Sequence, residues 1–149
     1  MIRRIQTEVG HRAGTSISAT PSGSLRGKLA ALAYHYPPEM PRTVPGSFDS
    51  RAVADETLDL GQPEALAVEF TGLRPGATFA VETLTRGHGD VMAAWHALGA
   101  PEPLSREQTQ HVRAAALATH RETVTVDATG RLRLARDLAS WSVVLISES

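Results

Sequence analysis

The chain has 149 residues, a formal net charge of −1 and 42% apolar residues, enough for one globular domain with a real core. The balanced charge gives no reason to expect nucleic acid or an anionic membrane as a partner, and no apolar run approaches the ~18 residues of a membrane span. The absence of cysteine excludes disulfides and thiolate metal sites. The start of the chain lacks the apolar segment of a signal peptide, which predicts a cytoplasmic protein.

The first 24 residues carry little hydrophobic pattern. They predict an N-terminal arm or an edge strand, with Ser16–Thr20 as the strand. Residues 25–149 are then expected to form one β-sandwich domain. Within it, Leu25–Tyr36 alternates as a strand does, but both of its faces are largely apolar, which predicts a strand covered on both sides.

The next stretch, residues 37–63, contains five of the nine prolines and is expected to be a surface loop. Long irregular connections are uncommon inside compact domains and often carry function. The apolar residues Val53 and Leu58–Leu60 predict an additional short edge strand within it.

Two alternating segments follow, Ala65–Leu73 and Thr78–Thr85. A glycine- and proline-containing turn separates them, so they are predicted to form an antiparallel hairpin. The order Leu73, Pro75 and Phe79 is also similar to the corners of fibronectin-like sandwiches, although the hydroxyl of a tyrosine corner is missing.

A short helix is predicted within Asp90–Pro101, and the rest of the chain is organised around it. The apolar residues that share one helical face are Val91, Ala94, Trp95 and Leu98. Asp90 stands at the N-cap position, and Gly99 and Pro101 follow the last turn as stop signals. Because Trp95 is in phase with the apolar face, we expect it to be anchored in the core; an exposed Trp95 would instead be able to stack on a sugar.

A second helix is expected at about 105–118. Ser105 and Gln108 have the spacing of a capping box, in which each side chain bonds the backbone of the other residue. Three strands follow, at Thr123–Val126, Arg131–Leu134 and Trp141–Ile146.

Short alternating strands on both sides of one helical pair predict a mainly β fold. We expect an antiparallel β-sandwich with the helical pair inserted at about 90–98 and 105–118. The aromatic residues of the strands, Tyr34, Tyr36 and Trp141, are expected in its core.

The residues that could carry chemistry do not form a catalytic or metal-binding pattern. The six histidines are His11, His35, His88, His96, His111 and His120. None has the close spacing of zinc ligands, so they are interpreted as surface or hydrogen-bonding imidazoles. There is no Gly-x-Ser-x-Gly motif, and no carboxylate pair stands out as a glycosidase acid and base. We therefore expect no catalytic residue, no metal site and no cofactor.

Seven residues of the helical region form one spaced pattern: His88, Asp90, Trp95, Gly99, Pro101, Ser105 and Gln108. This pattern resembles a segment near the C-terminus of family 39 glycoside hydrolases, the β-xylosidase and α-L-iduronidase group. The family segment reads His-Ser-Asn-Ala-Tyr-x-x-Trp-x-x-Met-Gly-Ser-Pro, then Pro-Thr-x-x-Gln. Here Asp90 replaces the family's asparagine and Met92 its tyrosine. The closing strands at 132–134 and 142–146 are also similar, and the resemblance covers about residues 25–147.

The resemblance implies an accessory domain. In the family, a (β/α)₈ barrel carries the acid/base glutamate in an Asn-Glu-Pro motif and a second glutamate as nucleophile. This chain contains no asparagine, and it is shorter than a barrel of ~200–250 residues. The resemblance therefore implies a non-catalytic C-terminal β-sandwich domain that supports a catalytic barrel absent from this chain. The chain would be a C-terminal fragment, a truncated reading frame or a stand-alone relative.

Two other functions stay open: a free-standing carbohydrate-binding module and an independent enzyme. An exposed apolar patch on one sheet would favour the accessory domain, and a row of exposed aromatic side chains would favour the module. A buried carboxylate pair in a cleft would favour the enzyme. The expected partners are a barrel domain, a second copy of the chain, or carbohydrate, with no nucleic acid and no membrane.

Overall fold

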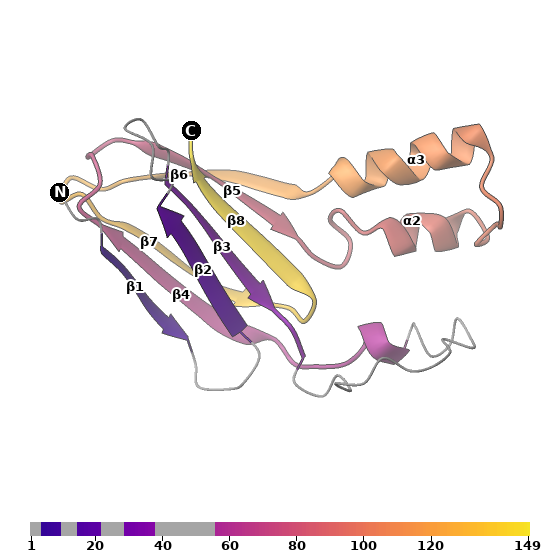
Figure 1. Cartoon of the computed structure of the whole chain (residues 1–149), viewed down its shortest axis with the longest axis horizontal. Helices are drawn as coiled ribbons and strands as arrows, with labels where there is room; N and C mark the ends of the chain where they lie inside the picture. The colour runs from indigo at the N-terminus through magenta and orange to yellow at the C-terminus, as the bar shows by residue number, and fades with distance from the viewer. Residues whose placement is uncertain (1–3, 10–14, 22–28, 38–55) are drawn as a thin grey trace.

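The computed structural model describes residues 4–9, 15–21, 29–37 and 56–149, and these form two antiparallel sheets packed face to face (Figure 1). Their strands are β1 Arg4–Val9, β2 Thr15–Pro21, β3 Leu29–His35, β4 Glu64–Thr71, β5 Thr78–Leu84, β6 His120–Thr125, β7 Leu132–Leu138 and β8 Ser142–Glu148. The smaller sheet has the order β1-β4-β7 and the larger one β2-β3-β8-β5-β6. The predicted mainly β sandwich is confirmed.

Both N-terminal strands lie at sheet edges. β1 pairs with β4, and β2 pairs with β3, so the edge strand predicted at Ser16–Thr20 is present as β2. The division of the chain into an arm over residues 1–24 and a domain over 25–149 stays a prediction.

The inserted helices are α2 Val91–Ala97 and α3 Arg106–Leu117, both between β5 and β6. Their predicted caps are confirmed. The Asp90 carboxylate accepts a hydrogen bond from the Ala93 N–H at 3.0 Å, and Ser105 and Gln108 form a reciprocal capping box. In the described part of the chain, no helix is long and apolar enough to cross a membrane.

The core fills the space between the two sheets. Phe70 of β4 and Phe79 of β5 stack across it with ring centroids 6.2 Å apart, and each is 1% exposed. β7 shows the predicted alternation: Leu132 and Leu134 are buried, and Arg133 between them is exposed. Apolar side chains from both sheets therefore meet in one layer, as in other sandwiches.

The hairpin predicted from Ala65–Leu73 and Thr78–Thr85 is wrong. β4 and β5 belong to different sheets, and the segment between them crosses from one sheet to the other. Leu73 is buried at this corner and its N–H donates to the Gly130 carbonyl at 3.1 Å, while the Gly76 N–H donates to the Val126 carbonyl. The crossing lets both strands bury their apolar faces in one core, which a flat hairpin would not allow.

The short strand predicted at Leu58–Leu60 is also wrong. Residues 56–58 form one helical turn, closed by hydrogen bonds from Asp59 N–H to the Glu56 carbonyl and from Leu60 N–H to the Thr57 carbonyl. The other part of that prediction, Val53, lies outside the described residues.

Trp95 is not a core residue, contrary to the prediction. α2 and α3 contact each other and project beyond the ends of the sheets (Figure 1), and neither helix has a buried residue. Trp95 is half-buried, and its indole N–H donates to the Pro101 carbonyl at 3.2 Å. Strand side chains already fill the space between the sheets, so no core position is left for this helix.

We expect Trp95→Ala to lower the free energy of unfolding by about 1–2 kcal/mol, because a half-buried ring and one hydrogen bond are lost rather than a core residue. Urea denaturation followed by circular dichroism measures this. Trp95→Phe keeps an aromatic ring without the N–H and should cost less than Trp95→Ala. A loss above about 3 kcal/mol, typical of a buried large aromatic, would contradict the half-buried position.

Candidate binding surface

The outer face of the larger sheet carries an exposed apolar surface. β3, predicted to be covered on both sides, is covered on one, and so is its neighbour β8. The inward residues are buried, while Leu32 is 38% and Leu145 37% exposed, directly opposite each other on the two strands. We call the exposed group the outer strip: Leu32, Tyr34, Tyr36, Leu84 and Leu145.

The outer strip is continuous across three strands. Tyr34 of β3 and Leu84 of β5 both lie opposite Val143 of β8, in one row across the sheet. The exposed strand aromatics correct the prediction that Tyr34 and Tyr36 are core residues. Large exposed apolar patches are uncommon on monomers and mark sites of interaction.

A charged cluster limits the outer strip on its β6 side. Glu82 lies opposite Leu145 and accepts hydrogen bonds from the Thr119 hydroxyl at 2.6 Å and from Arg121 at 2.9 Å. The Thr119 hydroxyl and then the Arg121 guanidinium hold the pKa of this carboxyl below its usual range. Glu82 therefore stays ionised at neutral pH, and the apolar surface ends there.

At the other end, an aromatic pair closes the outer strip. The Tyr36 and Trp141 rings meet edge to face with centroids 4.8 Å apart. Trp141 has a φ of +63°, in the left-handed region that bulky residues rarely adopt. Its N–H donates to the His35 carbonyl at 3.0 Å, which fixes this turn between β7 and β8.

A pocket of about 200 Å³ lies between this aromatic pair and α2. We call it the Trp141 pocket; its walls include Leu58, Leu84, Arg86, Val91, Met92 and Trp141. Arg86 also forms an exposed ion pair with Asp59, and Thr85, Asp90 and Ser140 add polar groups to the mainly apolar wall. Sheet, helix and the turn at 56–58 thus contribute to one concave site.

The residues of the predicted motif are distributed around this end of the molecule. Asp90 lines the Trp141 pocket, and its carboxylate caps α2. Gly99 has a φ of +83°, and the Pro101 carbonyl accepts the Trp95 hydrogen bond. Ser105 and Gln108 cap α3, and their role in a site stays a prediction.

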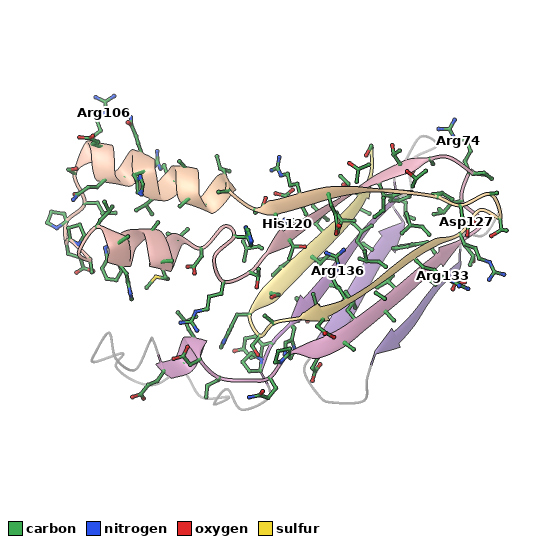
Figure 2. The ribbon with its side chains drawn as sticks, turned by 180° about the vertical axis from the view of Figure 1, so that it is seen from behind. Arg74, Arg106, His120, Asp127, Arg133 and Arg136 are labelled. Atoms are coloured by element: carbon green, nitrogen blue, oxygen red, sulfur yellow. The ribbon has the colours of Figure 1, made fainter. Side chains whose placement is uncertain are left out.

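His88 belongs to a second pocket, of about 370 Å³, at the base of the helical pair. Its ring lies 5.5 Å from that of His120, and Arg136 of β7 contributes to the same pocket (Figure 2). Arg136 forms an ion pair with Glu122, which offsets its charge. No group of three or more metal-ligating side chains that could hold an ion occurs among the described residues.

Ser140, His35 and Glu64 are far apart in the sequence but lie next to one another in the fold, in the serine–histidine–carboxylate order of a catalytic triad. The Ser140 hydroxyl lies 3.5 Å from His35 Nε2, and His35 Nδ1 lies 3.6 Å from Glu64. Nε2 also lies 2.8 Å from the Gln62 carbonyl, an acceptor, so this nitrogen carries a proton. With its proton directed at Gln62, Nε2 does not accept one from Ser140, so these three side chains do not form a proton relay in this arrangement. No sequence spacing signals it.

The fold and the surface together define the structural class of this chain. It is an antiparallel β-sandwich with a helical pair inserted between two strands of its larger sheet, and the outer face of that sheet carries the exposed outer strip. Solved glycoside hydrolases have this fold in part of their chains. The GH39 enzyme from Xanthomonas axonopodis pv. citri matches with a TM-score of 0.56 and 19% identity over 89% of this chain and 25% of its own. A monomeric β-xylosidase from Caulobacter crescentus matches with a TM-score of 0.55 and 22% identity, over 89% of this chain and 26% of the xylosidase.

A bacterial orthologue of human α-L-iduronidase matches with a TM-score of 0.60 and 16% identity over 90% of this chain. The chain spans about a quarter of the length of these proteins, from 22% to 26%. At such identities the likeness is one of fold. No protein-family model matches the chain, and no curated protein sequence matches it either.

Proposed function

We propose that the chain is a non-catalytic accessory β-sandwich domain of the family 39 glycoside hydrolase type, which packs against a catalytic (β/α)₈ barrel absent from this chain. The observation that carries this proposal is the outer strip, an apolar face that the described part of the chain leaves exposed over three strands. The motif from His88 to Gln108 and the shared fold of the solved enzymes support it.

The physical reason is the cost of leaving such a face in water. Burying apolar surface contributes about 25 cal/mol per Å², so covering five half-exposed side chains is favourable. Leu32 and Leu145 lie at the centre of the strip, and the charges of Glu82 and Arg121 stand at its border. An apolar centre with a charged rim is the usual composition of a protein interface.

Without a barrel, we expect the chain to self-associate through the outer strip at micromolar concentration. Sedimentation velocity should show a dimer of the 15.9 kDa chain, and Leu145→Lys should give the monomer because it places a charge at the centre of the strip. Ala135→Lys, on the exposed face of the smaller sheet, is the matched control and should still dimerise.

A dimer of moderate affinity would form well below about 100 micromolar. A chain that is still monomeric at that concentration would contradict the proposal that the outer strip is a contact face. The same preparation should give no turnover of aryl β-xylosides. Activity that stays with the chain through two columns would overturn the non-catalytic role.

A free-standing carbohydrate-binding module is the second candidate function. The exposed rings of Tyr34 and Tyr36, with the half-buried Trp141 beside them, favour it, because aromatic faces stack on the apolar faces of sugars. Electrophoresis in xylan-containing gels separates the two proposals. Retardation of a monomeric chain by xylan supports the module, and migration equal to that in a plain gel supports the accessory domain.

A further inference from the structure

We propose that the Trp141 pocket binds one pyranose ring of a neutral glycan, with the sugar's apolar face on the indole and its hydroxyls toward Arg86 and Asp59. This inference rests on the carbohydrate-binding candidate function and adds the place, the size and the charge of the ligand. It does not depend on whether the outer strip packs against a barrel.

The backbone of Trp141 is the first observation. Its φ of +63° is a conformation that glycine adopts freely and that is strained for a residue with a side chain. The bond from the Trp141 N–H to the His35 carbonyl and the edge-to-face contact with Tyr36 hold this conformation. Strained residues of this kind concentrate at ligand sites, and here the strained residue contributes a large flat ring to the wall of a cavity.

The size and walls of the pocket are the second observation. Drug-sized ligands occupy pockets of ~300–1,000 Å³, and this one measures about 200 Å³, which suits one ring rather than an oligosaccharide. Leu84 of β5 and Met92 of α2 stand with Trp141 in the wall, so the cavity offers apolar contacts to the C–H groups of a sugar ring.

The rim supplies the polar contacts. Arg86 and Asp59 are both exposed, with 60% and 65% of their side chains accessible, so their N–H groups and oxygens can also reach ligand hydroxyls. Their charges offset each other, and the Asp90 carboxylate is engaged by the N–H groups of Ala93 and Gly87. A neutral polyhydroxylated ligand therefore fits better than an anion or a cation.

The test uses Trp141 as its own reporter. In a Trp95→Phe background, Trp141 is the one remaining tryptophan of the two in the chain. Its fluorescence is titrated with methyl β-D-xyloside and methyl β-D-glucoside, and with sorbitol, an acyclic polyol that has hydroxyls but no ring face. We expect a saturable change with at least one pyranoside and none with sorbitol.

Two variants locate the binding. Met92→Ala removes a wall of the pocket and should weaken pyranoside binding about two- to tenfold, the range expected for one packed contact with a ring. Leu117→Ala, which truncates an exposed α3 side chain outside both the pocket and the outer strip, is the control and should bind as the parent does. Thermal melts of both variants verify that they are folded.

Each other outcome overturns the inference. No saturable response, an equal response to sorbitol, or unchanged binding by folded Met92→Ala would each show that the pocket holds no sugar ring. If the chain is still retarded in xylan gels in those cases, the carbohydrate-binding function stands and the site lies elsewhere. If xylan does not retard the chain either, both the carbohydrate-binding function and the sugar site in the Trp141 pocket are contradicted.

Discussion

Phe79→Ala should lower the free energy of unfolding by about 3–5 kcal/mol, the usual cost of truncating a fully buried aromatic. Phe79 is 1% exposed and stacks on Phe70 of the opposite sheet, so its loss leaves a cavity between the sheets. Total stabilities of single domains are about 5–15 kcal/mol, and this one change would remove a large part. Urea denaturation followed by circular dichroism gives the value.

The matched control is Leu84→Ala in the same strand. Leu84 points away from the core and is 41% exposed, so its truncation should cost under about 1 kcal/mol. Equal losses at the two positions would mean that the outer face of β5 is covered as well as the inner one. That result would also contradict the exposed outer strip.

Gly130→Ala should be nearly as damaging, by about 2–4 kcal/mol. Gly130 has a φ of +77°, and an added Cβ would lie 2.7 Å from the Leu73 carbonyl oxygen. The Gly130 carbonyl also accepts the hydrogen bond from the Leu73 N–H that holds the corner between the sheets. An alanine here therefore adds both backbone strain and a clash with backbone atoms that cannot move freely.

Gly76→Ala separates these two causes. Gly76 has nearly the same φ, +76°, but apart from the two residues adjacent to it in the chain, no atom lies within 4 Å of the place that an added Cβ would occupy. Its replacement should cost only the backbone strain, about 1–2 kcal/mol. If both variants lose the same stability, the close approach of Gly130 to Leu73 does not contribute, and the corner is looser than the structure shows.

The proposed functions depend on one end of the larger sheet. The outer strip meets the aromatic pair at Tyr36 and the Trp141 pocket at Leu84. The helical pair projects beyond the ends of the sheets (Figure 1). A domain that packs through the strip would place the pocket beside the interface. Of the strip residues, Leu84 alone also lines the pocket. A partner packed on the strip would therefore leave the other pocket walls free, and protein packing and sugar binding are compatible at this end.

Local chemistry is readable from the sequence alone. The caps at Asp90 and Ser105 depend only on residues three positions apart, and the alternation of Leu132 with Arg133 depends only on the period of a strand. Such short-range signals predict the strands, the helical pair and the sandwich class. The motif from His88 to Gln108 also points to the family whose solved members share the fold.

Long-range packing decides the rest. The segment after β4 could form a hairpin or a corner, and burying Phe70 and Phe79 from opposite sheets selects the corner. Trp95 lies on the helix as its sequence phase predicts, but strand side chains fill the core, which leaves the ring half-buried. The Trp141 pocket joins residues from 58 to 141, and only the tertiary structure brings them together, because no periodicity links residues that far apart.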